Sequence, residues 1–229
     1  MRQQLTRYWT DLWMRWAGPT RWGRLATMLA AFPYAPYKAR VALAHRYPQG
    51  YVAPSAQLSG QRIRRGRHVF IGDGVVIYQR QDGGAVELGD YVEIHRDTII
   101  ECGRGGKLVI GERTGIQPRC QLSAYVAPIV IGRGCQIAPQ CAFYPYNHGI
   151  APGQPIGNQP LTSKGPIILE DDVWLGYGVI VLSGVSIGVG TVVGAGSVVT
   201  RSLPAGVIAV GAPARIVGER TAASIDSLM

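Results

Sequence analysis

The residue best suited to acid–base chemistry is His148, which lies in the stretch YPYNHG within a segment rich in Pro and Gly. A neutral imidazole, with an unperturbed pKa of about 6.5, can accept a proton from a hydroxyl or an amine. A histidine in a loop is also a common surface residue. His148 is therefore a candidate general base, and the elements that hold it must decide between these two interpretations.

The remaining histidines and the cysteines do not form a metal-binding motif. His45, His68 and His95 include no HxxxxH pair. The four cysteines, at positions 102, 120, 135 and 141, have no CxxC spacing, so neither a zinc site nor a dense disulfide framework is indicated. We expect reduced thiols that pack in the interior, and no metal.

Aliphatic residues recur every six positions through most of the chain. A period of six fits neither the 3.6-residue helical pattern nor the two-residue strand pattern. It fits a triangular coil with three six-residue sides, on which equivalent positions stack about 4.8 Å apart and each buried aliphatic contributes roughly 1.5–3 kcal/mol. The uninterrupted part of the series is Leu169, Leu175, Val181, Ile187, Val193 and Val199.

One turn of this coil carries a long insertion. Counting turns between aliphatic residues gives 17 residues from Ile71 to Leu88, but 38 from Ile131 to Leu169, where a regular turn would need 18. The excess corresponds to residues 144–165, which contain four Pro and four Gly. A loop this long in a compact domain usually has a function. The insertion contains His148 and is the predicted active-site loop.

The glycine-rich composition argues against a helical bundle, and the positive net charge favours anionic partners. The chain has 31 Gly but only 3 Phe, and its net charge is +9. Such a charge suits nucleic acid, acidic lipid or a phosphorylated cofactor, but the basic run over 62–67 lacks the aromatic interleaving of a nucleic-acid site. No apolar run reaches the ~18 residues of a membrane span. We expect a cytoplasmic protein, with the inner membrane surface as the alternative location.

Residues 1–50 lie outside the repeat and have helical character. The spacing of Leu5, Trp9, Leu12, Trp13 and Trp16 places them on one helical face, and a second helix is predicted from about residue 20 to 31. This basic, Trp-rich extension could cap the open end of the coil. Peripheral membrane contact through residues 1–31 is the other interpretation.

The run from Pro166 to Val217, PIILEDDVWLGYGVIVLSGVSIGVGTVVGAGSVVTRSLPAGVIAVGAPARIV, resembles the C-terminal half of hexapeptide-repeat acyltransferases of the sugar O-acetyltransferase type. The resemblance covers about residues 66–218. It implies an all-β, left-handed parallel β-helix over 51–217, with a helical extension before it and a tail over 218–229. The left hand comes from the family, because parallel crossovers are otherwise right-handed. The resemblance also implies a homotrimer with active sites between subunits.

The segment IAPQCAFYPYNH resembles the active-site segment of that family, in which the histidine is the general base. This implies acetyl transfer from acetyl-CoA to a hydroxyl of a saccharide or glycoconjugate, with His148 removing the proton. Backbone N–H groups at Gly176 and Tyr177 are candidates to stabilise the thioester oxyanion. Relatives often have serine where Tyr177 stands, so no hydroxyl role is carried over to this tyrosine. Gly176 could also serve only as a corner residue.

The family's coenzyme and acceptor positions map onto further residues. Arg201 stands where relatives often have lysine and could grip a phosphate, but it could equally be a solvated charge. Trp174 could line the coenzyme channel or pack between subunits. The cofactor-binding candidates are Trp174, Gly178, Ala195, Thr200, Arg201 and Arg215. The acceptor-binding candidates are Gln117, Tyr146 and Asn147, although a turn would also explain Asn147.

Other functions share parts of this pattern. A γ-type carbonic anhydrase has the same helix but needs three histidines from adjacent turns, which the histidine spacing does not indicate. A nucleotidyltransferase is disfavoured, because no nucleotide-binding βαβ unit precedes the repeat. A non-catalytic β-helix scaffold, or a basic protein that binds nucleic acid or a membrane surface, remains the alternative to the acyltransferase.

Overall fold

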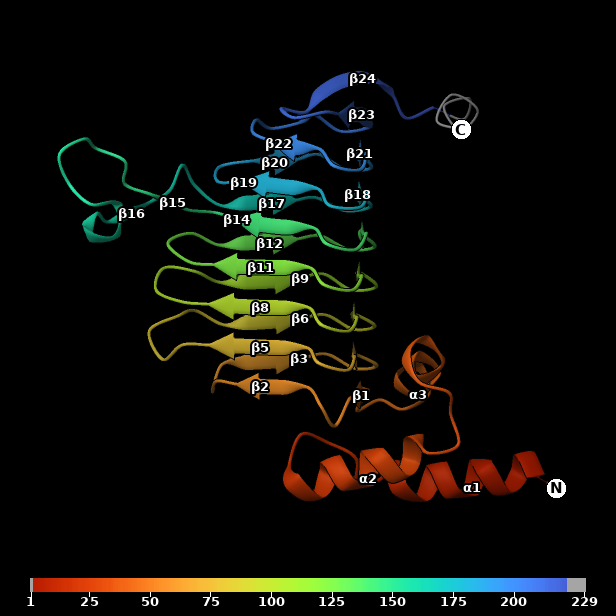
Figure 1. Ribbon diagram of the computed structural model, residues 1–229. Helices are drawn as coiled ribbons and strands as arrows, with labels where there is room; N and C mark the ends of the chain where they lie inside the picture. The colour runs from red at the N-terminus through yellow and green to blue at the C-terminus, as the bar shows by residue number, and fades with distance from the viewer. Residues whose placement is uncertain (1, 222–229) are drawn as a thin grey trace.

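The computed structural model describes residues 2–221, which form a three-sided parallel β-helix with helices at its N-terminal end (Figure 1). Side A consists of β1 (Tyr51–Val52), β4 (Phe70–Ile71), β7 (Glu93–Ile94), β10 (Gly115–Ile116), β13 (Gln136–Ile137), β18 (Trp174–Leu175), β21 (Val192–Val193), β23 (Val207–Val210) and β24 (Arg215–Glu219). Side B consists of β2 (Gln57–Ser59), β5 (Val76–Gln79), β8 (Ile99–Cys102), β11 (Gln121–Ala124), β14 (Ala142–Tyr144), β19 (Ile180–Leu182) and β22 (Val198–Val199). Side C consists of β3 (Ile63–Arg65), β6 (Val86–Leu88), β9 (Leu108–Ile110), β12 (Ile129–Ile131), β17 (Ile167–Leu169) and β20 (Ser186–Ile187).

The chain winds with a left hand. In Figure 1 the strands of side B run leftward at the front and those of side C run rightward behind them, while the chain climbs from the N-terminal end. The predicted fold class is therefore confirmed. We call the corners where the chain passes from one side to the next edges A–B, B–C and C–A.

The interior is filled by the predicted aliphatic ladder. Equivalent residues stack from coil to coil, as when Ile94 pairs with Ile71 below and with Ile116 above. The largest fully buried side chains include Phe143. All four cysteines are buried and free, as expected, and burial raises the pKa of the Cys102 and Cys135 thiols. These two thiols pack in the interior like small apolar side chains.

The predicted 17-residue turn from Ile71 to Leu88 is wrong, because these two residues do not occupy equivalent positions on successive coils. Ile71 lies on side A, whereas Leu88 lies on side C and pairs with Arg65 of the coil below. The count fails because the early coils carry extra residues at edge B–C, in the connections β5–β6, β8–β9 and β11–β12, which break the six-residue step. These connections bulge on the left of Figure 1.

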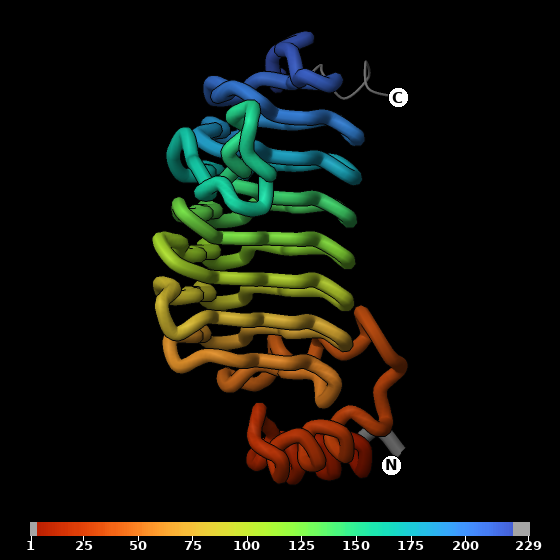
Figure 2. The backbone as a smooth tube through the Cα atoms, turned by 60° about the vertical axis from the view of Figure 1, so that its left-hand side comes forward, coloured from red at the N-terminus to blue at the C-terminus, as the bar shows by residue number. Residues whose placement is uncertain are grey.

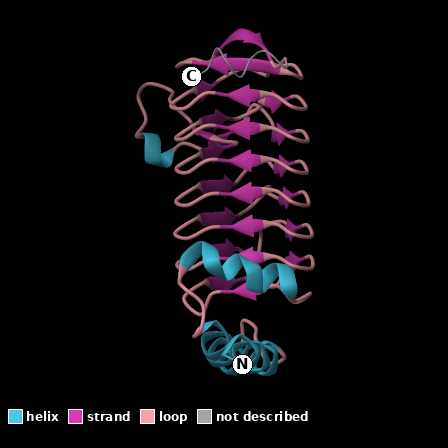
Figure 3. Ribbon diagram, turned by 90° about the vertical axis from the view of Figure 1, so that its right-hand side faces the viewer, coloured by secondary structure: helices cyan, strands magenta, loops and turns pink. Residues whose placement is uncertain are grey.

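Four short helices precede the β-helix: α1 (Arg2–Met14), α2 (Arg21–Ala31), the 3-10 helix η1 (Tyr37–Arg40) and α3 (Val41–Arg46). Helices α1 and α2 lie beneath the first coil, and α3 lies against its flank (Figures 1 and 3). Ala31, Leu43 and Ala44 join the main core, so part of this extension covers the open end. None of the described helices is both long and apolar enough to cross a bilayer.

At the other end, β23 and β24 form an antiparallel pair that closes the last coil. Strand β24 continues to Glu219, and most of the predicted tail, residues 222–229, lies outside the described residues. One large excursion leaves the β-helix between β14 and β17, at the predicted place. We call residues 145–166 the arm; it contains β15 (Asn147–His148), the 3-10 helix η2 (Ile156–Asn158) and β16 (Leu161–Thr162) and projects from edge B–C (Figure 2).

Candidate functional site

The arm is an ordered hairpin. Strands β15 and β16 pair in antiparallel fashion, so His148 lies opposite Leu161. Beyond them, the buried side chain of Gln159 accepts a hydrogen bond from Ala151 N at 2.8 Å and donates to the carbonyl oxygens of Ala151 and Gln154, both at 3.0 Å. One glutamine therefore satisfies three backbone groups and fixes the path of the tip.

Side-chain hydrogen bonds also tie the base of the arm to the β-helix. Asn147 Nδ2 donates to Ser183 Oγ of the next coil at 3.1 Å. Ser163 Oγ donates to Pro145 O at 2.5 Å and accepts from Gly165 N at 3.0 Å, which joins the two strands of the arm where they leave. Asn147, an acceptor-binding candidate, thus has a structural partner and positions the residue that follows it.

His148 itself is exposed, and no hydrogen bond or ion pair involves its ring within residues 2–221. Its nitrogens are therefore available to accept a proton from a bound ligand. Tyr146 is half-buried and makes edge-on ring contacts with Tyr144 and Tyr125, each with centroids 5.9 Å apart. The three tyrosine rings form an aromatic cluster beside the point where the arm leaves the β-helix.

The predicted oxyanion donors lie at edge A–B, just after β18. Gly176 N–H donates to Val193 O at 2.8 Å, and Gly178 N–H donates to Pro139 O at 2.9 Å, so both belong to the coil-to-coil ladder. Tyr177 N–H has no such acceptor among the described residues. Of the three amides at this corner, Tyr177 N–H is the one left to donate to a ligand.

Gly176 has a packing reason of its own. A Cβ at this position would lie 2.6 Å from Ala195 N of the next coil, closer than real contacts allow. The Tyr177 side chain is 52% exposed and borders a hollow of about 310 Å³ with Tyr37, Arg96 and Arg119. The corner therefore combines a tight backbone with an open, basic surface.

One chain does not bring His148 and the Tyr177 amide together. His148 lies on the arm beyond edge B–C, while Tyr177 lies at edge A–B, and side B separates the two (Figure 1). The path along side B from Tyr177 to Leu182 covers roughly 16 Å at about 3.3 Å per residue. The arm then extends away from the β-helix and does not fold back across side B.

The other predicted positions divide between these edges. Gln117 and Ala195 share edge A–B with Tyr177, below and above it. Trp174 is 49% exposed on the outer face of side A. Thr200 and Arg201 follow β22 and are exposed at edge B–C. Arg215 is exposed on β24, where it donates to Ala214 O at 2.9 Å.

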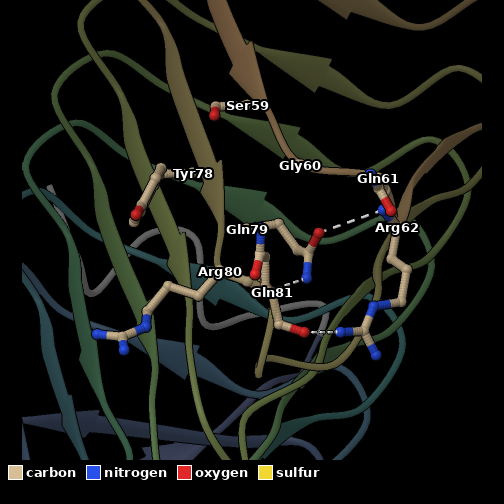
Figure 4. Close-up of a pocket in the computed structure, with 8 residues that line it drawn as sticks. All are labelled: Ser59, Gly60, Gln61, Arg62, Tyr78, Gln79, Arg80 and Gln81. Atoms are coloured by element: carbon tan, nitrogen blue, oxygen red, sulfur yellow. Dashed lines mark hydrogen bonds between the residues drawn. The ribbon is translucent and has the colours of Figure 1, made fainter.

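A separate hollow of about 600 Å³ lies at edge B–C of the first coils, three strands of side B below the origin of the arm. In Figure 4 its polar groups satisfy one another: Gln79 Oε1 accepts from Arg62 N at 3.2 Å, and Arg62 also bonds Gln81 O. Arg80 pairs with Asp82 at 3.0 Å. This hollow contains no histidine and lies apart from the candidate base.

The remaining histidines gather near α3 and do not form a metal site. His45 Nε2 and His95 Nε2 lie 3.0 and 3.1 Å from the two carboxylate oxygens of Glu93. His68 stacks on Tyr91 with ring centroids 4.5 Å apart. No group of three His, Cys, Asp or Glu residues within 2–221 is arranged to hold a metal.

Sequence reasoning missed the residues that position the arm. Gln159, Ser163 and Ser183 hold His148 in place through the hydrogen bonds described above, yet none belongs to a recognisable motif. The signal available in the sequence was only their location, within or one coil above the insertion. The sequence also could not show that the Gly176 N–H is used in a coil-to-coil hydrogen bond while the Tyr177 N–H is not, because this depends on the backbone geometry of the corner.

Comparison with known proteins finds similarity to acyltransferases. Residues 166–201 match the family model described as the hexapeptide repeat of succinyl-transferase. A Mycobacterium tuberculosis protein named as an acetyltransferase is 33% identical over 159 residues, which are 69% of this chain and 52% of that protein. The chain spans about half or less of the length of the first curated relatives that it matches.

Two solved structures resemble the β-helix. AntD, an N-acyltransferase from Bacillus cereus, was solved with dTDP-4-amino-4,6-dideoxyglucose and coenzyme A; it has a TM-score of 0.59 and 25% identity over 72% of this chain and 87% of AntD. NeuO, a polySia-specific acetyltransferase, has a TM-score of 0.50 and 27% identity over 72% of this chain and 70% of NeuO. With the repeat and the winding described above, these matches show that the chain belongs to the hexapeptide-repeat acyltransferase family.

Proposed function

We propose that this protein is an acyl-CoA-dependent O-acyltransferase that transfers an acetyl group to a hydroxyl of a saccharide or glycoconjugate. The observation that carries the proposal is His148. Its imidazole is exposed, has no hydrogen-bond partner among the described residues, and lies on the arm in the segment that resembles the family's active-site segment. The acetyltransferase relative and the sugar-modifying enzymes AntD and NeuO support the reaction class and the acceptor class.

The proposed chemistry needs one base and one oxyanion donor. A ring nitrogen of His148 takes the proton of the acceptor hydroxyl as its oxygen attacks the thioester carbonyl carbon. The negative charge that forms on the carbonyl oxygen is stabilised by a backbone N–H, for which Tyr177 is the candidate. Collapse of the tetrahedral intermediate breaks the C–S bond. The leaving coenzyme thiolate takes the proton back from His148, which gives the free thiol and a neutral imidazole. No covalent acyl-enzyme is required.

The coenzyme is proposed to lie along edge A–B and the coils above Tyr177. Trp174, Gly178 and Ala195 would border its pantetheine arm. The phosphates would meet Arg215, or Thr200 and Arg201 at edge B–C of the adjacent protomer in the trimer proposed below. Gln117, Tyr146 and Asn147 remain the proposed acceptor-binding residues. Asn147 would act mainly by holding the base of the arm, since its amide already bonds Ser183.

We further propose that a homotrimer completes the site. The separation of His148 from Tyr177 across side B supports this, because one chain alone cannot present both groups to one substrate. In a closed ring of three protomers, edge B–C of one protomer can face edge A–B of the next. Each interface would then hold one base and one oxyanion donor.

Transfer to an amine is the second candidate, because AntD is an N-acyltransferase that was solved with an amino sugar. The two can be separated with acetyl-CoA and paired panels of hydroxyl sugars and amino sugars. Thiol release would be followed in a colorimetric assay, and products by mass spectrometry before and after mild alkali. Alkali removes an ester but leaves an amide intact.

The test of His148 is its replacement by alanine. We expect His148→Ala to lower the rate at least ~100-fold, because a general base typically contributes 10²–10⁴-fold. Ile150→Ala is a matched control, since Ile150 is 82% exposed on the same arm. Near-full activity of His148→Ala would refute its role as base. A wild-type protein that acetylates neither panel would favour the scaffold interpretation.

A further inference from the structure

The N-terminal helices present an exposed apolar surface, separate from the arm. Each helix, together with the residue or two after its end, carries a stripe of large apolar side chains in the helical pattern. The spacings are 3, 4, 7 and 11 residues from Leu5 and 3, 6 and 10 from Trp22. Their exposed fractions lie between 41% and 85%. The set, which we call the hairpin face, is Leu5, Tyr8, Trp9, Leu12, Trp16, Trp22, Leu25, Met28 and Phe32.

These two stripes belong to one surface. Trp9 Nε1 donates to Leu29 O at 2.7 Å, which holds α1 beside α2. A hollow of about 400 Å³ between the helices is lined by Trp13, Trp16, Trp22, Leu25 and Ala26, from both sides of the turn. The stripes therefore meet in a continuous apolar surface.

The hairpin face lies on the side of the helices away from the β-helix. The fully buried residues of α1 and α2, such as Met14 and Ala30, are on the opposite side of each helix at 100° per residue. That buried side is attached: Gln49 Nε2 donates to Met14 O at 2.7 Å, and Ala31 packs in the main core. Both helices lie crosswise beneath the first coil (Figures 1 and 2). The apolar surface therefore faces outward at one end of the molecule.

Arginines lie beside this surface without acidic partners among the described residues. Residues 1–50 contain eight Lys or Arg residues but one acid, Asp11. Asp11 is engaged with Arg46 at 3.0 Å on the attached side of α1. Within residues 2–221, no ion pair involves the three arginines beside the stripes, Arg15, Arg21 and Arg24.

The apolar side chains and the unpaired arginines together favour a lipid surface over a second copy of the chain as the partner of this face. Tryptophans and leucines with interspersed arginines suit the interface of an anionic bilayer, where rings enter the headgroup boundary and cations meet lipid phosphates. A second copy of the same face would bring two unpaired arginine clusters together, and like charges across an interface are unfavourable. The charges therefore argue for a lipid surface.

We propose that the hairpin face docks the protein on an anionic membrane surface. Helices α1 and α2 lie in the plane of the headgroups, and the β-helix stands away from the bilayer. This inference rests on the helices alone and holds whether or not the proposed acyl transfer is correct.

The test is flotation of the full chain with vesicles of phosphatidylcholine alone or with 30% phosphatidylglycerol. We expect binding to the anionic vesicles that weakens in 0.5 M NaCl, and a partition coefficient at least ~10-fold lower for Trp16→Glu/Trp22→Glu, because both rings are lost from the interface. These side chains are 72% and 82% exposed, so the variant should keep its melting temperature. Val217→Glu, 62% exposed at the other end, is the matched control and should bind like the wild type.

Fluorescence gives an independent measurement, because four of the five tryptophans, all except Trp174, lie at positions 9 to 22. Lipids brominated near the headgroup should quench the wild-type emission and leave Trp16→Glu/Trp22→Glu much less affected. Equal flotation of the wild type and the double variant would overturn the proposal. The proposal would also fail if the wild type did not bind anionic vesicles and Trp16→Glu/Trp22→Glu had a lower sedimentation coefficient than the wild type. The face would then join copies of the chain.

Discussion

The separation of His148 from Tyr177 predicts that two inactive variants can restore activity to each other. His148→Ala removes the base at edge B–C. Ala195→Trp places a large ring on the exposed corner one coil above Gly176, in the proposed coenzyme groove at edge A–B. Each variant alone should have little activity. The two substitutions lie on different edges, so an interface between unlike protomers can have an intact residue on each side.

The expected recovery follows from random assembly. A site that takes His148 from one protomer and the groove from the next is intact when the first protomer carries Ala195→Trp and the second carries His148→Ala. With equal amounts of both chains this occurs at about one interface in four. Co-expressed chains should therefore show about a quarter of the wild-type rate in the acetyl-CoA assay. Chains that are purified separately and mixed without subunit exchange are the control. A co-expressed sample no more active than its parents would refute the shared site.

Three further predictions concern single residues. Gln159→Ala should lower kcat about 10-fold with little change in melting temperature, because the loosened arm mispositions His148 and its hydrogen bonds lie outside the core; an unchanged kcat would show that the tip does not matter. Gly176→Ala should destabilise the fold by about 1–3 kcal/mol in urea unfolding, because its Cβ would meet Ala195 N, whereas Gly218→Ala, with nothing within 4 Å, should be neutral; equal effects would argue against this close approach. Hydrogen bonding to His95 and the nearby His45 lower the pKa of Glu93, so its contribution to stability is present above the ordinary Glu pKa of about 4.3 and is lost as the pH falls through the lower folded value; the melting temperature of Glu93→Gln should therefore fall less on acidification than that of the wild type, and parallel curves would contradict this.

The ladder was predictable from the sequence because each core position repeats the same requirement. Leu175 and Val193 occupy equivalent places one coil apart, and only an aliphatic side chain fits the interior. The count failed between Ile71 and Leu88, where extra residues at edge B–C leave the hydrophobic spacing without a fixed step. Periodicity reports which side chains are inside, but not how far a surface connection extends.

The candidate site was predictable only in part. The insertion identified His148, because its length was visible as a gap in the ladder. The partners that hold the arm, such as Gln159, depend on the path of an irregular loop, and no residue pattern encodes that path. The N-terminal helices were likewise visible from the spacing of Leu5, Trp9 and Leu12. Which side they turn to the β-helix depends on contacts such as that between Gln49 and Met14.

The central claim is that His148 acts on a thioester presented by a neighbouring protomer, and a crystal structure with coenzyme A bound tests it most directly. We expect the coenzyme sulfur to lie within hydrogen-bond reach, about 3–4 Å, of a His148 ring nitrogen of one protomer. The pantetheine of the same molecule should contact Tyr177 and Ala195 of the next protomer. A coenzyme bound to a single chain, with its sulfur far from every His148 ring, would contradict the account.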